Sequence, residues 1–175
     1  MYENYIDNLK SNNVEVLLDS IYELSAERGR EPEGEIRKLL LKHTCHKDPE
    51  VRQIAVKTVA MHWPITEAFG IIKIKLEGQE EDEDVLETAV RSLGGFTRNS
   101  DVSKSDINLT LINVIRNHSL SNQLKKIAYI GLLIMHEEIT VAQYAFMSMD
   151  MNSVTIDETR VNTWVIPLKN RGVEG

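Results

Sequence analysis

Apolar residues recur along the chain at the spacing of an amphipathic α-helix, and one arrangement of them repeats. In each copy, three residues spaced i, i+4, i+8 lie on one helix face, with a small residue in the centre. The copies are Val16/Ser20/Leu24, Val51/Ala55/Val59, Val85/Ala89/Leu93 and Leu124/Ala128/Leu132. Because the central positions are 35, 34 and 39 residues apart, the pattern predicts a repeated pair of helices.

A residue suited to capping a helix precedes each trio by three positions. Asn13, Asp48, Asp82 and Ser121 all carry side chains that accept hydrogen bonds from the first N–H groups of a helix. Pro49 follows Asp48 at the first helical position, where its missing N–H has no cost. We therefore expect the trios to lie on helices that begin directly after these four residues.

Other apolar stripes lie between the trios and predict the first helix of each pair. They comprise Ile36, Leu39, Leu40 and His43; Ile65, Phe69, Ile72 and Leu76; and Ile107, Leu111, Val114 and Ile115. The predicted helices span about 2–10, 13–28, 34–46, 49–62, 65–78, 83–97, 105–118, 122–137 and 140–150. Gly70, Gly94, Gly95 and Gly131 fall inside them, as close-packing points or as kinks.

One segment resembles the second-helix signature of HEAT repeats: Asp48-Pro49-Glu50-Val51-Arg52-Gln53-Ile54-Ala55. The resemblance is best over residues 34–97 and extends over about 13–137. The Asp/Arg pair of the family occurs only as Asp48 and Arg52, because Leu86 and Lys125 take the Arg position in later copies. The resemblance therefore implies a shared apolar spine without a continuous polar ladder.

The predicted fold class is all-α. The resemblance implies a right-handed α-solenoid of about four HEAT-like helix pairs, with atypical ends. A further C-terminal helix and a tail complete the chain. The expected domains are a helical repeat domain over 1–151 and an extended or partly disordered tail over 152–175, where Val154, Ile156 and Trp164 are among the β-branched and aromatic residues. This tail can fold back over the last helix.

Charge and composition narrow the class of partner. The chain of 175 residues has 20 basic and 27 acidic residues, a net charge of −7, so its field repels nucleic acid and attracts basic protein surfaces. The longest apolar run, 127–135, is shorter than the roughly 20 residues of a membrane span. With a single cysteine, Cys45, and no signal-peptide pattern at the start, we expect a cytoplasmic protein.

Catalytic motifs are not evident in the sequence, so we expect a protein that is not an enzyme and needs no cofactor. Some HEAT-like proteins are DNA glycosylases or cofactor lyases, and the resemblance leaves that alternative open. His43, Cys45 and His46 are residues of metal-ligand type. Their spacing fits no metal motif, and imidazoles near the end of a helix are the preferred interpretation, so no metal is expected.

An acidic run begins at the end of the fifth predicted helix, and it has two interpretations. Its carboxylates belong to Glu77, Glu80, Glu81, Asp82, Glu83 and Asp84. The simpler interpretation is a solvated turn that favours the N-terminus of the next helix. The functional interpretation is a docking site for a basic protein surface.

The favoured function is a non-catalytic protein-binding module that acts as a monomer or a heterodimer. Its candidate partner-binding residues are Arg52, Lys57, Trp63, Glu80, Glu81, Asp82, Glu83, Asp84, Glu87, Arg91 and Lys125. Trp63 has a second interpretation, a core residue that seals a helix corner. The sharper hypothesis is a bacterial immunity protein that covers the active site of a basic, nuclease-like toxin. The alternative is a cytoplasmic scaffold or assembly factor in a larger complex.

Overall fold

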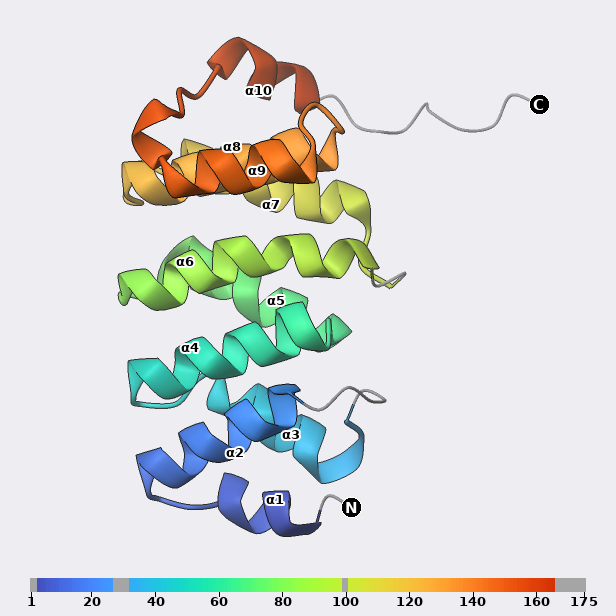
Figure 1. Cartoon of the computed structure of the whole chain (residues 1–175), viewed down its shortest axis with the longest axis vertical. Coiled ribbons are helices and arrows are strands. Elements are labelled where there is room, and N and C mark those ends of the chain that lie inside the picture. Colours follow the sequence, from blue (N-terminus) through green and yellow to red (C-terminus); the bar gives the residue numbers. More distant parts are fainter. Residues whose placement is uncertain (1–2, 27–31, 99–100, 166–175) are drawn as a thin grey trace, which may run out of the picture. The chain divides into compact units, whose positions relative to one another are not determined.

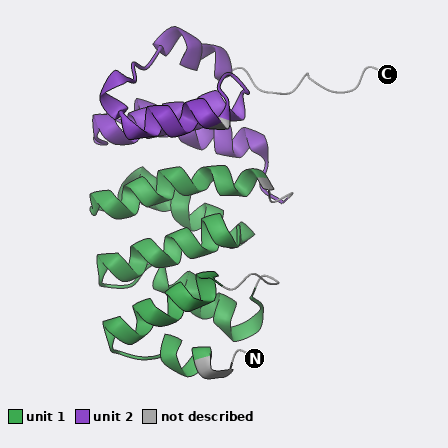
Figure 2. Ribbon diagram, viewed as in Figure 1, with its two compact units in different colours: residues 1–99 green, residues 100–175 purple. Residues whose placement is uncertain are grey.

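The computed structural model describes residues 3–26, 32–98 and 101–165, and these residues form helices joined by turns (Figure 1). The all-α prediction is confirmed for this part of the chain. The chain divides into two units, Met1–Asn99 and Ser100–Gly175 (Figure 2). No described helix has both the length and the apolar character that crossing a membrane requires.

Unit 1 consists of three consecutive helix pairs. The helices are α1 (Glu3–Leu9), α2 (Val14–Ala26), α3 (Gly34–His43), α4 (Pro49–Lys57), α5 (Thr66–Ile74) and α6 (Glu83–Ser92). Short helical segments continue three of them: the π-helical turns η1 (Thr58–His62) and η2 (Lys75–Gln79), and the 3₁₀ turn η3 (Leu93–Arg98). The second helices, α2, α4 and α6, pack in a row (Figure 1).

Unit 2 contains the antiparallel pair α7 (Lys104–Arg116) and α8 (Asn122–Met135), which make its most extensive contact. The helix α9 (Val141–Met149) packs on α8, and the short turn η4 (Met151–Ser153) leads to α10 (Glu158–Trp164).

The predicted helices are all present within a few residues of their expected bounds; residues 2, 27 and 28 of the predictions lie outside the described residues. The central residues Ser20, Ala55, Ala89 and Ala128 are all buried, as are the other members of the trios except the half-buried Val16. Burial on a helix follows the period of 3.6 residues. The spacing of apolar residues therefore predicted correctly which helix faces lie in the core.

One close approach of the backbone in unit 1 depends on glycine. A Cβ atom added to Gly95 would lie 2.1 Å from the carbonyl oxygen of Ala60, so η3 packs directly against η1. Because the obstacle is backbone, a side-chain rotation cannot relieve it. Of the four glycines that lie inside predicted helices, Gly95 is confirmed as a close-packing point.

The C-terminal segment differs from the extended tail that its composition suggests. Residues 154–157 have no regular secondary structure, but Glu158–Trp164 form a helix whose Val161 and Trp164 are buried. Asp157 begins this helix by accepting the N–H of Arg160 at 3.0 Å. The division into domains 1–151 and 152–175 stays a prediction, and residues 166–175 lie outside the described residues.

Residues 158–164 form a helix, and not the predicted tail, because tertiary contacts of Trp164 anchor α10 to α7 and α8. Its ring stacks on His136 at a centroid distance of 4.8 Å, and its carbonyl accepts a 3.0 Å bond from the amide of Asn108. The Nε2 atom of His136 bonds the Oδ1 of Asn108 at 2.8 Å. The indole N–H donates to Glu138 at 3.2 Å. These contacts order a segment whose local sequence has weak helix propensity.

Candidate functional site

The second helices begin at the predicted N-cap residues, and the candidate site lies beside these helix ends. In unit 1, Asp48 accepts the N–H groups of residues 50 and 51 at 3.0 and 3.3 Å, and Asp82 accepts those of residues 84 and 85 at 3.1 and 3.0 Å. Asn13 and Ser121 accept analogous bonds from residues 15 and 124. All four predicted caps are confirmed, and they explain why the helices begin there.

Glu80 is the centre of a buried ion network between the α3–α4 loop and the turn before α6. Its carboxylate accepts bonds from Nε and Nη2 of Arg52, at 2.9 and 2.7 Å, and from Nζ of Lys75 at 2.9 Å. The backbone N–H groups of Glu81 and Asp82 also donate to it, at 3.3 and 3.2 Å. The remaining amino group of Arg52, Nη1, donates to the carbonyls of His46 and Lys47 at 2.9 and 3.0 Å.

Burial and hydrogen bonding act in opposite directions on the Glu80 carboxyl. Burial alone raises its pKa, because the charged form loses hydration. The bonds from Arg52, Lys75 and the N–H of Asp82 outweigh burial and lower the pKa to about 2. Glu80 is therefore ionised in the fold, and two cations compensate its charge.

This network changes the interpretation of the acidic run. Glu80 is only 8% exposed, so it stabilises the fold and is not available to a partner. Asp82 is partly buried and caps α6. Glu77, Glu81, Glu83 and Asp84 remain exposed. Asp82 therefore fits the interpretation as a turn that favours the next helix, whereas the buried Glu80 fits neither a solvated turn nor a docking site. The exposed residues keep the docking hypothesis open.

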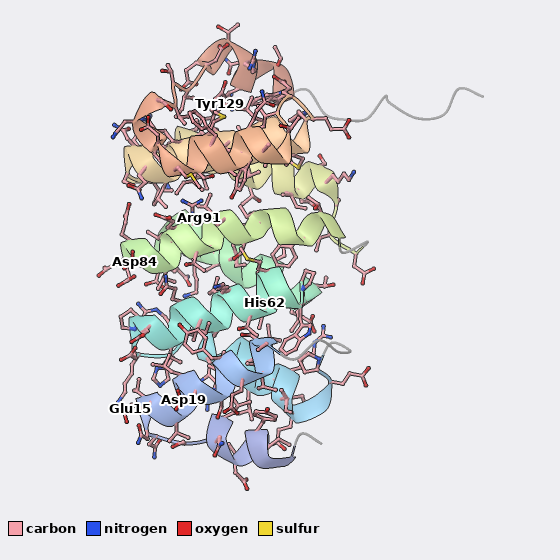
Figure 3. The ribbon with its side chains drawn as sticks, viewed as in Figure 1. Glu15, Asp19, His62, Asp84, Arg91 and Tyr129 are labelled. Atoms are coloured by element: carbon pink, nitrogen blue, oxygen red, sulfur yellow. The ribbon has the colours of Figure 1, made fainter. Side chains whose placement is uncertain are left out.

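The fold extends this acidic surface beyond the sequence run. Because α2, α4 and α6 begin on the same side of unit 1 (Figure 1), the exposed Glu15 and Asp84 lie near N-terminal helix ends on that side (Figure 3). Glu50, which is also exposed, lies in the first turn of α4. We call Glu15, Glu50, Glu81, Glu83 and Asp84 the acidic edge. Lys47, which is exposed in the α3–α4 loop, interrupts it.

The other predicted binding residues have different surroundings. Trp63 is only 7% exposed, so it is a core residue and the surface-anchor hypothesis for it is wrong. Arg52 is committed to Glu80. Glu87 and Arg91 pair with each other on α6 at 2.8 Å.

The remaining two predicted residues belong to different units. Lys57 is exposed at the end of α4 in unit 1, whereas Lys125 is half-buried on α8 in unit 2. Both were predicted as binding residues because they lie off the apolar stripes of their helices.

A pocket of about 540 Å³ opens beside the ion network in unit 1. It is lined by Cys45, His46, Arg52, Ile71, Ile74, Lys75, Gly78, Gln79, Glu80 and Glu81. Gly78, with φ at +117°, turns the chain at this point. The Nδ1 atom of His46 accepts the backbone N–H of Asp48 at 3.1 Å, so that lone pair is already used in the loop.

His43, which shares the metal-type cluster with Cys45 and His46, has a structural role. Its Nε2 atom bonds the carbonyl of Leu9 at 2.7 Å and so joins α3 to α1. Burial lowers the pKa of this imidazole, although its bond to Leu9 opposes the change. Cys45 is exposed. Among the described residues, no three His, Cys, Asp or Glu side chains form a group that could hold a metal ion.

Sequence reasoning missed Lys75, although a signal was present. It is 5% exposed and lies three residues after the buried Ile72, on the same apolar stripe. A lysine at a stripe position indicates a buried charge that needs a partner. The partner, Glu80, lies across the turn at Gly78 and could not be identified from helical spacing.

No known family, curated protein or solved structure was found to match this chain.

Proposed function

We propose that this chain is a non-catalytic protein-binding module and that the acidic edge of unit 1 meets a basic surface on its partner. The observation that carries this proposal is the row of exposed carboxylates at the N-terminal ends of α2, α4 and α6. A rigid row of like charges attracts an oppositely charged surface and speeds its association.

The distribution of roles among the carboxylates supports this proposal. Glu80 is neutralised inside the fold, and Asp82 is bonded to backbone N–H groups. Glu81 and Asp84, by contrast, expose their side chains to solvent. The bonds to the Glu80 carboxylate come from Arg52, Lys75 and two backbone N–H groups, so they do not use the carboxylates of Glu81 or Asp84.

The finer architecture belongs to the same proposal. We infer that the helix pairs are HEAT-like and continue as a right-handed α-solenoid of about four pairs. The packing of α2, α4 and α6 in one row supports this inference within unit 1. In a repeat stack of this kind, the row of second helices offers an extended surface to a partner.

The sharper form of the proposal is an immunity protein that covers the active site of a basic toxin. The net charge of −7 favours it, since an acidic surface competes with phosphate for a nuclease site. A scaffold in a cytoplasmic complex would use the same surface without inhibiting its partner.

The test is a quantitative affinity capture from the native host with three baits. The first is the wild-type chain, and the second carries Glu81→Gln, Glu83→Gln and Asp84→Asn. Glu80 and Asp82 stay intact because their loss would unfold the turn. The third, a control with equal charge, carries Asp7→Asn, Glu23→Gln and Glu158→Gln, which neutralise exposed carboxylates elsewhere.

We expect one basic partner to be retained by the wild type and the control and lost by the acidic-edge variant. Its association rate should fall steeply as ionic strength rises. A partner with nuclease activity that the wild type inhibits would establish the immunity role, whereas a multi-subunit complex would establish the scaffold. Equal retention by all three baits would overturn the acidic-edge proposal.

A further inference from the structure

The pocket beside the ion network of unit 1 combines a buried cation with an apolar wall. Its volume of about 540 Å³ lies within the range of about 300–1,000 Å³ that is usual for small-molecule sites. Ile71 and Ile74 on α5 line it together with Lys75, the first residue of η2. Their spacing of i, i+3 and i+4 places the three side chains on one helix face. The apolar wall therefore lies within about one turn of Lys75.

Lys75 carries more hydrogen-bond donors than the fold uses. Its ammonium group has three N–H groups. One of them bonds Glu80 at 2.9 Å, and no other side chain or carbonyl of the described ranges 3–26, 32–98 and 101–165 accepts from it. Because Lys75 is buried and lines the pocket, the pocket is the space from which a further acceptor can reach it. Two donors of a buried charge are thus left for a molecule bound there.

The α3–α4 loop adds another donor to the pocket lining. The Nδ1 atom of His46 accepts the backbone N–H of Asp48, so the ring carries its proton on Nε2. The buried acceptor of the site, by contrast, is fully used. The carboxylate of Glu80 already accepts bonds from Arg52, Lys75 and two backbone N–H groups. The pocket therefore offers donors, and a ligand that fits it has to offer acceptors.

Charge around the pocket limits how negative such a ligand can be. The buried network contains two cations and one carboxylate, a sum of +1. Against this charge, the exposed Glu81 lines the pocket, and Asp48 and Asp82 interact electrostatically with Arg52. These carboxylates oppose a doubly charged group such as phosphate. A carboxylate has a single charge and two acceptor oxygens, which suit the two unused N–H groups of Lys75.

We propose that this pocket binds a small monocarboxylate with an aliphatic chain. Lys75 donates to the carboxylate, and the chain packs against Ile71 and Ile74. Ile74 is 46% exposed, and this apolar surface is what the chain covers. The proposal is carried by unused donors next to an apolar wall and not by an excess of charge. It goes beyond the proposed protein-binding function and does not depend on the acidic edge.

Cys45 allows the site to be tested in the full chain, because it is exposed, lines the pocket and is the single cysteine. The rate of its alkylation by iodoacetamide, a neutral reagent, is measured in the presence of octanoate, acetate or octylammonium. We expect octanoate to slow the reaction in a saturable manner. Acetate should bind more weakly, since each buried methylene strengthens binding about fourfold. Octylammonium, which has the same chain length and the opposite charge, should leave the rate unchanged.

Two variants remove the two parts of the site, and each has a matched control. Lys75→Met removes the donors, and Lys73→Met makes the same change at an exposed position of α5. Ile74→Ser removes part of the apolar wall, and Leu109→Ser removes a side chain that is 49% exposed in unit 2. We expect Lys75→Met to weaken octanoate binding at least ~10-fold and Ile74→Ser about fourfold. Both controls should bind octanoate as the wild type does.

Lys75→Met also removes one partner of Glu80, so circular dichroism checks its fold. If that variant unfolds, Ile74→Ser and its control decide, because the Ile74 side chain is exposed. An alkylation rate that ~10 mM octanoate leaves unchanged would overturn the proposal, since a site with a millimolar Kd would be about nine-tenths occupied. Equal slowing by octylammonium, or equal weakening in either control variant, would overturn it as well.

Discussion

Unit 1 joins its loops through a buried ion network, whereas unit 2 joins its last helix through amide and ring contacts. In unit 1 the carboxylate of Glu80 lies between Arg52 and Lys75. In unit 2 the amide of Asn108 links His136 to the carbonyl of Trp164. Both networks fix a segment that helix propensity alone would not place.

Because one network is ionic and the other is built on an amide, we expect mutations and acid to destabilise the two units to different extents. A buried ion network is costly to break, because removing one member leaves other charges without compensation. The hydrogen bonds of an amide are less costly to break, since the amide of Asn108 carries no charge. The ion network also depends on pH through the ionisation of Glu80, so acid should weaken unit 1 through a route specific to that residue.

The two tryptophans of the chain, Trp63 in unit 1 and Trp164 in unit 2, allow each unit to be followed by its own fluorescence. The Trp164→Phe background reports unit 1, and the Trp63→Phe background reports unit 2. The predictions below use the unfolding free energy measured in the matching background.

The largest expected effect is that of Glu80→Ala. Because Arg52 and Lys75 would be left partly buried without their counter-ion, we expect unit 1 to lose about 3–5 kcal/mol in urea unfolding. Glu81→Ala, which removes the exposed neighbouring carboxylate, should change stability by less than about 0.5 kcal/mol. Similar values for the two variants would show that the ion network contributes little.

The pH dependence of the unfolding free energy of unit 1 should show the contribution of Glu80. The pKa of Glu80 is lowered from 4.5 to about 2 in the folded chain, so its contribution is fully present above pH 4.5 and is lost as pH falls toward 2. Linkage gives a contribution on the order of 3 kcal/mol. Unfolding free energies of unit 1 should therefore fall over this pH range more steeply in the wild type than in Glu80→Gln. Parallel pH curves would contradict the assignment.

In unit 2, Asn108→Ala tests the amide network. Loss of the amide leaves the carbonyl of Trp164 and the ring of His136 without these hydrogen bonds, and we expect unit 2 to lose about 1–3 kcal/mol. The control is Asn113→Ala, an exposed asparagine on the same helix. If salt changed the loss in Asn108→Ala as much as that in Glu80→Ala, the contrast between the two networks would fail.

The last comparison is between a glycine in each unit, and it includes the smallest expected effect, that of Gly131→Ala. Gly95→Ala places its Cβ against the carbonyl oxygen of Ala60 at 2.1 Å and should cost about 1–3 kcal/mol. At Gly131, an added Cβ would meet only side-chain atoms of Leu111 at 3.5 Å, so Gly131→Ala should stabilise α8 by about 0.4–1 kcal/mol. Thermal or urea unfolding distinguishes the two signs.

The candidate site was predictable where it depended on helix ends. Asp48 and Asp82 could be identified as caps from their distance to the next apolar trio, and both accept the expected bonds. Glu80 could not be separated from its acidic neighbours, because all of them look alike in sequence. Its role depends on Arg52 and Lys75, which reach it from other elements.

The sequence by itself determined the approximate bounds of the described helices up to residue 149, and the core faces of those that carry the apolar trios and stripes, because helical periodicity and capping are local. The tertiary structure alone decided which charges are buried, since Lys75 and Glu80 meet only after the chain turns at Gly78. It also decided that residues 158–164 form a helix, because Trp164 gains partners from α7 and α8. Local patterns specify which face of a helix is apolar, but only packing specifies what covers that face.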